Sequence, residues 1–303
     1  MVDVAVQLGP LALRSPLVAA SGTVGSVVDF AAVGALEAYG AATAKSVSER
    51  EWPGRPQPRL APIGPGMLNA IGIQNPGITE WARRYGPQIA GVGVPVWGSV
   101  VGHTPREFGG VAAAMSLCPV AAVEINLSCP NLDDGRMFAL DAAATGSVVS
   151  AVRAATALPI GAKLSPNAPD IVDIAVAAVD AGADWLVLTN TVLGLGIDVE
   201  HRRPLLAAGP GGYSGTPIKP LALRCVWEVH RAMPEVPIVG CGGVRSGTDV
   251  VEYLLAGASA VALGTVHFAE PRAGRRIRRE LERWCSRHGV GKVAELTGGA
   301  KPW

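Results

Sequence analysis

Short apolar runs alternate with segments of helical periodicity along most of the chain. The runs, each a predicted strand, are Leu17 to Ala20, Ala41 to Lys45, Val94 to Val100, Val120 to Leu127, Pro159 to Leu164, Trp185 to Thr189, Pro237 to Gly240 and Ala258 to Leu263. The segments expected to be helical are Asp29 to Tyr39, Pro105 to Met115, Gly146 to Ala155, Ala168 to Ala181, Pro217 to Ala232, Gly247 to Ala256 and Arg272 to His288. Eight strands that are each followed by a crossover predict an α/β fold, a parallel (β/α)₈ TIM barrel. A doubly wound open sheet is the alternative.

Three segments fall outside this alternation. Val4 to Leu13, interrupted by Gly9-Pro10, predicts a small N-terminal hairpin that caps one end of the body. Residues 46 to 80 are rich in Pro and Gly, and Gly194 to Gly215 is rich in glycine. Long loops in a compact domain are usually lids or binding loops. We therefore expect them as insertions on the C-terminal face, where these barrels carry their active sites.

Composition sets the class of protein. Hydrophobic residues make up 49% of the 303 residues and charged residues 17%, which allows a large core. We expect residues 1–303 to form a single barrel domain. The formal net charge of +1 disfavours nucleic acid as a partner. No signal-peptide pattern or long unbroken apolar run is present, so we expect a soluble, cytoplasmic protein with no membrane partner.

The five cysteines, at positions 118, 129, 225, 241 and 285, include no C-x-x-C pair. A scattered, odd set is typical of reduced thiols and predicts neither a disulfide framework nor a metal site. It also lacks the ligands of an iron–sulfur cluster. A cluster of that kind would have to lie on a partner.

The most informative stretch is Glu124-Ile125-Asn126-Leu127-Ser128-Cys129-Pro130-Asn131. Proline ends a strand, so Cys129 is expected where a strand gives way to a loop. A cysteine within an apolar strand is more often a small buried hydrophobe. A cysteine in a polar loop between two asparagines favours a chemical role instead. A thiol, with an ordinary pKa of about 8.5, can act as base or acid near neutrality.

Lysines are rare in this arginine-rich chain, and two of them end predicted strands. Lys45 closes the second strand and Lys163 the fifth. A lysine retained among arginines suggests a position that needs a compact ammonium. Lys163 has three interpretations: a Schiff-base nucleophile, a fixed cation beside an electron-rich cofactor, or a structural residue with a buried stem. The presence of Lys45 favours electrostatic stabilisation over a Schiff base.

Asparagines recur beside the same strand ends and loops. Asn69, Asn126, Asn131 and Asn190 offer neutral hydrogen-bond donors and acceptors. That set suits a flat heterocycle with alternating N–H and C=O groups, although each asparagine alone is more often a turn or cap residue.

Two glycine-rich loops follow the last two predicted strands. They read Gly240-Cys241-Gly242-Gly243-Val244 and Leu263-Gly264-Thr265. In barrels of this kind the loops after strands seven and eight usually bind phosphate through backbone N–H groups. The pair therefore predicts a phosphorylated ligand, with simple tight turns as the alternative.

Together these residues resemble the dihydroorotate dehydrogenases over almost the whole chain. The resemblance is carried by Ala20-Ser21-Gly22, Ala44-Lys45-Ser46, Pro58-Arg59, Gly66 to Gly77, Asn126 to Asn131, Lys163 to Asn167, Asn190-Thr191, Gly211 to Gly215, Ile218-Lys219-Pro220 and the two phosphate loops. It implies an FMN-dependent enzyme that oxidises (S)-dihydroorotate to orotate in de novo pyrimidine (UMP) biosynthesis.

Within the family, the cysteine in Asn-Leu-Ser-Cys-Pro-Asn is similar to the soluble members. The membrane-bound, quinone-linked class has serine there. The stretch from Thr189 to Pro220 most resembles the NAD-linked class, whose FMN subunit pairs with a subunit that carries FAD and a 2Fe-2S cluster. The fumarate-linked homodimer is the competing subclass, so the resemblance implies a homodimer or a heterotetramer.

The resemblance also implies roles for individual residues. Cys129 would take a proton from the ring carbon next to the carbonyl, and the neighbouring carbon would give hydride to FMN. Lys45 would lie beside the flavin and the substrate carboxylate. The substrate would be held by Lys45, Asn69, Asn126, Asn131, Asn190 and Thr191. FMN would be held by Ser21, Gly22, Lys45, Ser46, Lys163, Gly215, Gly242, Gly243, Gly264 and Thr265. No metal is implied, and the loop from Pro130 to Phe138 would be a lid that excludes water.

Two segments depart from the family pattern. Trp97-Gly98-Ser99-Val100 stands where an asparagine is expected at the third strand. Trp52-Pro53-Gly54-Arg55-Pro56 replaces the usual Arg-x-Gly-Asn-Pro. The first bears on flavin contacts, and the second on contacts with the substrate carboxylate or a partner.

Three other functions are weighed against this one. The first is reduction of uracil or thymine, as in the similar dihydropyrimidine dehydrogenases. The second is a Schiff-base aldolase that uses Lys163. The third is a flavin-binding subunit with no activity of its own.

Overall fold

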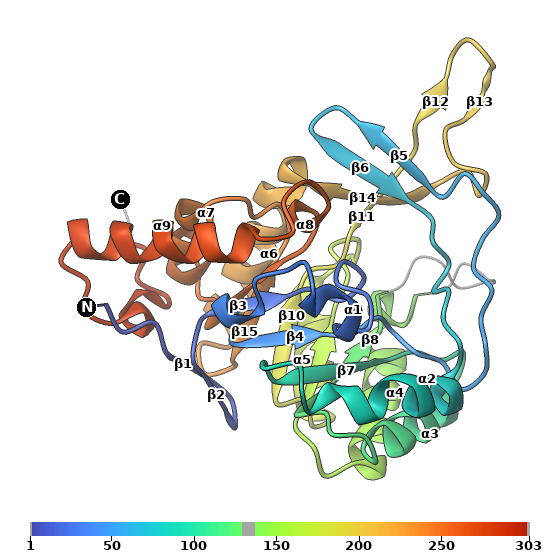
Figure 1. Cartoon of the computed structure of the whole chain (residues 1–303), viewed down its shortest axis with the longest axis horizontal. Helices are drawn as coiled ribbons and strands as arrows, with labels where there is room; N and C mark the ends of the chain where they lie inside the picture. The colour runs from blue at the N-terminus through green and yellow to red at the C-terminus, as the bar shows by residue number, and fades with distance from the viewer. Residues whose placement is uncertain (1, 129–136, 302–303) are drawn as a thin grey trace.

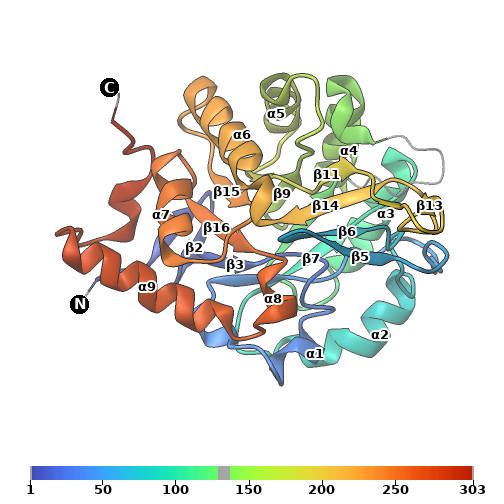
Figure 2. The ribbon, with the colours of Figure 1, turned by 90° about the horizontal axis from the view of Figure 1, so that it is seen from above.

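The structure is a computed structural model that describes residues 2–128 and 137–301. Within them, eight parallel strands close into a barrel in the order β10-β15-β16-β3-β4-β7-β8-β9 (Figures 1 and 2). The strands are β3 (Leu17–Ala19), β4 (Ala41–Thr43), β7 (Val96–Val100), β8 (Ala122–Asn126), β9 (Ile160–Lys163), β10 (Trp185–Leu188), β15 (Ile238–Cys241) and β16 (Ala260–Leu263). The predicted (β/α)₈ barrel is confirmed, and the open-sheet alternative is excluded.

The barrel strands are apolar on both faces because one face meets the interior and the other meets the helices. On β7, Gly98 lies against Met115 of a flanking helix, so Trp97 and Ser99 point the other way, into the barrel. Trp97 packs against Trp185 of β10, with ring centroids 5.1 Å apart. These two buried indoles fill the interior away from the strands' C-terminal ends.

Helices follow the barrel strands and cover them from outside (Figure 2). They are α1 (Val28–Ala31), α2 (Ile78–Ile89), α3 (Pro105–Met115), α4 (Ala142–Ala155), α5 (Ile171–Asp180), α6 (Lys219–Ala232), α7 (Gly247–Leu255), α8 (Val266–Ala269) and α9 (Ala273–Arg287). Short 3₁₀ turns are η1 (Leu36–Ala38), η2 (Phe138–Leu140), η3 (Thr216–Ile218) and η4 (Val293–Leu296). Side-chain caps fix the starts of α3, α4, α5 and α7, each accepting a backbone N–H of the first turn.

Two helix predictions are corrected. The helix expected from Asp29 to Tyr39 is broken into α1 and η1 at Ala35, which has a non-helical backbone (φ −114°, ψ 65°), and the preceding Gly34 lowers the helix propensity there. Asp29 lies inside the first turn of α1 and does not cap it. The loop expected to reach residue 80 instead ends at α2, which carries Pro87 near its C-terminal end and buries Trp81. The short helix α8 was not predicted.

The N-terminal hairpin is confirmed as β1 (Val6–Leu8) paired with β2 (Leu11–Leu13) around Gly9-Pro10. Gly9 lies close to Asp184, which precedes β10, so the hairpin lies at the N-terminal end of the barrel strands.

The two long insertions are not irregular loops. They form one antiparallel sheet in the order β11-β14-β6-β5, and Figures 1 and 2 show it lying across the barrel. Its strands are β5 (Leu60–Ile63), β6 (Gly66–Asn69), β11 (Val192–Gly194) and β14 (Gly211–Gly215). A separate pair, β12 (Ile197–Asp198) and β13 (Arg203–Pro204), extends beyond it. The strands β6 and β14 are remote in sequence and pair with each other. The sheet that they form covers the C-terminal face of the barrel.

Among the described residues, no helix has the length and apolar character needed to cross a membrane.

Candidate active site

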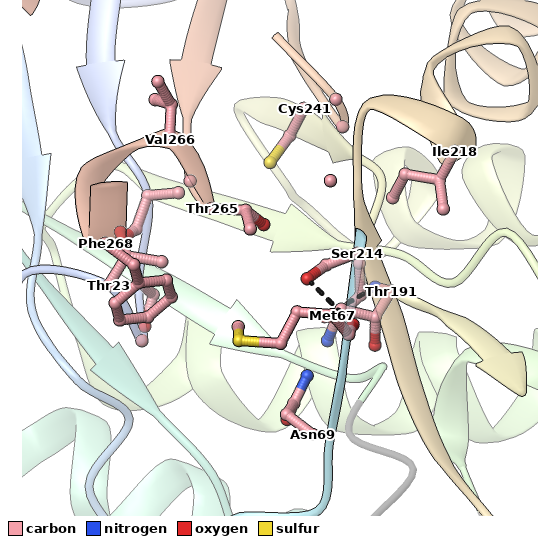
Figure 3. A pocket seen from close by; sticks show the side chains of 18 of the residues that line it. Thr23, Met67, Asn69, Thr191, Ser214, Ile218, Cys241, Thr265, Val266 and Phe268 are labelled. Atoms are coloured by element: carbon pink, nitrogen blue, oxygen red, sulfur yellow. Dashed lines mark hydrogen bonds between the residues drawn. The ribbon is translucent and has the colours of Figure 1, made fainter. Parts of the chain in front are cut away.

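A cavity of about 560 Å³ lies where the C-terminal ends of the barrel strands meet the inserted sheet. A volume of this size is typical of a site for a small molecule or cofactor. Its floor and walls come from strand ends, and Met67, Asn69 and Ser214 reach it from the inserted sheet (Figure 3). The cavity is therefore at the catalytic face of the fold.

Every predicted site residue within the described ranges lines this cavity. These are Ser21, Gly22, Lys45, Ser46, Asn69, Asn126, Lys163, Asn190, Thr191, Gly215, Gly242, Gly243, Gly264 and Thr265. Cys129 and Asn131 lie outside the described residues, as does most of the expected lid. The structure brings the described residues together, while the role assigned to each stays a prediction.

A chain of amide and hydroxyl groups crosses the ends of β4, β7 and β8. Asn126 Nδ2 donates to Ser46 Oγ at 2.9 Å, and Ser46 Oγ lies 2.9 Å from Ser99 Oγ. Ser99 is fully buried, so it supports Ser46 from below. This bond fixes the amide plane of Asn126 at the cavity wall.

Asn190, two residues after the end of β10, lines the same cavity wall as Asn126. Its Nδ2 donates to the backbone O of Ser128 at 3.0 Å and to Ser128 Oγ at 2.9 Å. Its Oδ1 accepts from the backbone N of Thr191 at 2.8 Å. Asn190 therefore holds the residue just before Cys129 in the chain.

The inserted sheet positions the other predicted substrate residues. Asn69 Nδ2 donates to the backbone O of Gly212, its partner across β6 and β14, at 3.1 Å. Asn167 Nδ2 donates to the backbone O of Thr191 at 3.2 Å. A side chain at position 212 would collide with Thr191, so the bare backbone there lets the sheet close over the cavity.

A buried carboxyl lies beneath the cavity floor beside Lys163. Glu124 and Asn126 share one face of β8, and both point into the barrel. Glu124 is 3% exposed and accepts from Thr43 Oγ1 at 3.3 Å, while its Oε1 has no hydrogen-bond partner in the part of the chain that the structure describes. Burial raises the pKa of Glu124, against the lowering effects of the Lys163 ammonium and the Thr43 hydrogen bond.

Lys163 itself is 7% exposed at the end of β9, opposite Asn126. It is thus a nearly buried cation at the cavity wall, with Glu124 and Cys241 nearby. Burial raises the pKa of the Cys241 thiol, which favours its neutral form. Lys45 is half-buried on the opposite side of Asn126, at the end of β4.

The loops after β15 and β16 present bare backbone to one end of the cavity. Gly243 has φ of +69°, and a Cβ there would lie 2.9 Å from the backbone O of Gly215. At Gly264 an added Cβ would meet nothing closer than 3.8 Å, so its open side faces the cavity. Backbone N–H groups exposed in this way suit the phosphate of a nucleotide-like ligand.

Sequence reasoning missed several residues around the cavity. Met67 and Ser214 come from strands that were expected to be loops. Glu124 could have been found from the sequence, because residues two positions apart in a strand lie on the same face. A charged residue two positions before Asn126 therefore points to the same side of the sheet as Asn126. His267 stands behind the cavity wall, 2% exposed, and no local pattern marked it. Burial lowers the pKa of His267 to about 4.

The two departures from the family pattern lie beside the cavity lining. Trp97 fills the barrel interior, and Ser99 supports Ser46. Trp52 pairs through its backbone with Asn75 and stacks on His103 at 4.4 Å. The backbone N of Arg55 donates to the O of Ile71, which lines the cavity. The segment from residue 52 to residue 56 thus supports the lining from outside.

A parallel barrel with a polar cavity at its strand ends and bare loops after its last two strands is the arrangement of a TIM-barrel enzyme. The family model for dihydroorotate dehydrogenase matches residues 4–284. The chain is 46% identical over 298 residues to the dihydroorotate dehydrogenase B (NAD(+)) catalytic subunit of Pelobacter propionicus, covering 98% of each chain. It is 45% identical to the protein of that name from Geobacter sulfurreducens, covering 98% and 97%.

The chain therefore belongs to the dihydroorotate dehydrogenase family, a family of flavin-dependent oxidoreductases. A crystal structure of DHODH from Eimeria tenella in complex with ferulenol has the same fold, with a TM-score of 0.82. That likeness covers 98% of this chain and 88% of the other at 20% identity, so it concerns the fold alone.

Proposed function

We propose that this chain is the FMN-binding catalytic subunit of an NAD-linked dihydroorotate dehydrogenase, which oxidises (S)-dihydroorotate to orotate in pyrimidine biosynthesis. The observation that carries the proposal is that two strand-end lysines and three asparagines from separate segments converge on one cavity in a member of this family. The relatives named above are catalytic subunits of NAD(+)-linked enzymes.

The cavity is suited to FMN at its glycine-rich end. Gly215, Gly242, Gly243, Gly264 and Thr265 would hold the phosphate through backbone N–H groups. Ser21, Gly22, Lys45, Ser46 and Lys163 line the remaining wall, where the flavin ring would lie. FMN, when bound, supplies the acceptor for the hydride. The nearly buried Lys163 provides a fixed positive charge on that wall.

The substrate would lie against the amide-rich end. Asn69, Asn126, Asn190 and Thr191 offer donors and acceptors that match a pyrimidine ring, and Lys45 offers a cation for its carboxylate. Asn131 completes this set as a prediction that lies outside the described residues. The hydrogen bonds of Asn126 to Ser46 and of Asn190 to Ser128 would orient the ring before reaction.

Cys129 is proposed as the general base that takes a proton from the substrate ring. It also lies outside the described residues, and the support comes from its neighbours. Ser128 precedes it and is held by two hydrogen bonds from Asn190 at the cavity wall. A thiol near its ordinary pKa is suited to proton transfer around neutral pH.

Replacing Cys129 with alanine tests this role. We expect Cys129→Ala to keep bound FMN but to slow its anaerobic reduction by dihydroorotate by about 10²- to 10⁴-fold, the usual contribution of a general base. The measurement is loss of visible flavin absorption after rapid mixing. The matched control is Cys118→Ala, which removes a thiol that does not line the cavity. Bleaching of the Cys129→Ala enzyme at the wild-type rate would contradict the assignment.

Reduction of uracil or thymine is tested by the same assay with dihydrouracil or dihydrothymine in place of dihydroorotate. The acidic substrate is favoured because Lys45 lies at the cavity wall beside the asparagines. If dihydrouracil reduced the flavin as fast as dihydroorotate does, we would propose dihydrouracil as the substrate instead. The Schiff-base hypothesis is not favoured by the family, and borohydride trapping on Lys163 is not expected.

A separate subunit would carry the electrons from FMN to NAD through FAD and a 2Fe-2S cluster. The relatives' description as a catalytic subunit supports a second chain. We also infer a cytoplasmic location, since the cysteines in the described ranges are free thiols. The purified chain should reduce an artificial dye with dihydroorotate but reduce NAD poorly. Efficient NAD reduction by this chain alone would contradict the need for a partner.

A further inference from the structure

We propose that His267 is a positioning residue for the phosphate end of the FMN site, as a neutral imidazole with its proton on Nδ1. It would act by locking together the loop after β3 and the loop after β16. The inference rests on the proposed function because it takes FMN as the ligand. Its hydrogen-bond geometry, however, belongs to this chain whatever ligand binds.

His267 is placed between the cavity and the helix that follows it. It belongs to α8, and its sequence neighbours Thr265, Val266 and Phe268 line the cavity around it (Figure 3). Its ring packs against Phe30 at 5.3 Å and edge-on to Tyr39 at 5.9 Å. Both ring nitrogens face hydroxyl groups, Nδ1 at 2.9 Å from Thr23 Oγ1 and Nε2 at 2.8 Å from Tyr39 Oη.

The direction of each hydrogen bond follows from the available protons. Thr23 Oγ1 donates its single proton to the backbone O of Ala20 at 2.9 Å. It must therefore accept from His267, which places a proton on Nδ1. A neutral ring with its proton on Nδ1 has a bare Nε2, so Tyr39 Oη donates to that nitrogen. We call the hydrogen-bonded series Thr23, His267 and Tyr39 the relay. A neutral imidazole satisfies all of its polar groups, in agreement with the low pKa that burial gives His267.

The relay joins two loops that both border the predicted phosphate site. β16 and β3 are neighbours in the barrel, and the backbone N of Ala20 donates to the O of Leu263 at 2.9 Å. An added Cβ at Gly264 would lie 3.8 Å from Ala20 and 3.9 Å from Thr23. The rotamer of Thr23 thus sets the wall opposite Gly264, and His267 sets that rotamer.

The relay also has an anchor outside the cavity. Gly274 lies in the first turn of α9, and a Cβ there would overlap the Tyr39 ring. A fully satisfied buried polar network holds its members in one geometry. The backbone N–H groups of Gly264 and Thr265 would be held in this way at a constant distance from the phosphate. Loss of the relay should therefore weaken the binding of FMN and not that of riboflavin, because riboflavin has no phosphate.

Nitrogen-15 NMR of the histidine ring tests the protonation state directly on the wild-type chain, with or without flavin. We expect His267 to be neutral and protonated on Nδ1 near pH 7. An imidazole protonated on Nε2, or on both nitrogens, would overturn the proposal.

Flavin affinity tests the positioning role. Thr23→Val and His267→Phe should each weaken FMN binding about tenfold, the effect of losing roughly 1.4 kcal/mol of binding free energy. Riboflavin binding should change less than about twofold, since each variant acts at the phosphate end. The dissociation constants are measured by quenching of flavin fluorescence. Unchanged FMN affinity in Thr23→Val, or an equal loss for FMN and riboflavin, would overturn the proposal.

The matched control is Thr145→Val. Thr145 is buried, and its Oγ1, like that of the half-buried Thr23, donates to a backbone carbonyl, that of Phe138, at 2.9 Å. It lies outside the cavity lining, so this variant should lose thermal stability comparably yet keep FMN affinity. Failure of the wild-type chain to bind either flavin would contradict the proposed function, and the NMR result would still decide the state of His267.

Discussion

Glu124 shows how much a single position in a strand can determine. It shares a face with Asn126, so the strand that delivers an amide to the cavity also delivers a carboxyl to the layer below. Among the described residues, Thr43 donates the one hydrogen bond that Glu124 accepts, and Lys163 is the cation nearby. The charge state of Glu124 in the barrel interior therefore affects the electrostatic potential at Lys163 on the cavity wall.

The pH dependence of stability should reveal this carboxyl. Burial raises its pKa, so the folded protein binds the proton more tightly than the unfolded chain does. The free energy of unfolding should therefore fall as pH rises from the unfolded value of 4.5 through the folded value. Glu124→Gln keeps an acceptor for Thr43 without the charge and should remove this component, which approaches about 1.4 kcal/mol per pH unit.

Denaturant unfolding of both proteins at several pH values from about 5 to about 8 measures the difference. The gain of Glu124→Gln over wild type should increase toward high pH. Glu49→Gln, at an exposed carboxyl, serves as control. A pH-independent difference between Glu124→Gln and wild type would show that Glu124 keeps its ordinary pKa.

The strands and helices differ in how well local pattern predicted them. The barrel strands are continuous apolar runs that are buried on both faces, and each was located. The helices with side-chain caps, such as α5 behind Asp170, were also located. The helix expected from Asp29 to Tyr39 is interrupted at Ala35, which follows Gly34 and has a non-helical backbone. The helix α2 was missed because its Gly86-Pro87 resembles a turn. The inserted sheet was missed because its central pair, β6 with β14, joins segments remote in sequence, although β5 and β6 form a local hairpin.

The packing of β9 against β10 gives a test of an element. A Cβ at Gly161 would overlap the Trp185 indole, so Gly161→Ala should lower the free energy of unfolding by roughly 1–3 kcal/mol through overpacking. The control is Gly110→Ala on the exposed side of α3, where a Cβ meets nothing within 4 Å. That change should raise the free energy of unfolding by roughly 0.5–1 kcal/mol. Urea unfolding measures both, and an unchanged Gly161→Ala protein would contradict the packing.

The barrel core joins the two ends of the described chain. Buried residues from the N-terminal hairpin to η4 belong to one contiguous apolar cluster, while the inserted sheet has a small cluster of its own. Because β16 pairs with β3, the loops after the first and last barrel strands lie together at one end of the cavity. Cavity formation and barrel closure are therefore expected to depend on each other.

This coupling predicts the unfolding behaviour of the whole chain as one domain. Thermal unfolding should show a single transition, and FMN at about 100 times its dissociation constant should add about 2.7 kcal/mol of stability. Calorimetry with and without FMN checks both expectations. Two transitions, with only one shifted by FMN, would show that the cavity and the barrel core unfold separately.

Local sequence was sufficient for the barrel and its strand ends, because apolar runs and turn residues act through neighbours in the chain. It also placed Lys45, Lys163, Asn126 and the glycine loops at the same face, since parallel strands share one direction. Three-dimensional packing was needed for the rest. The pairing of β6 with β14, the position of Glu124 beside Lys163 and the relay through His267 all join residues distant in sequence. Such contacts form only when the closed barrel brings them together, so no local pattern encodes them.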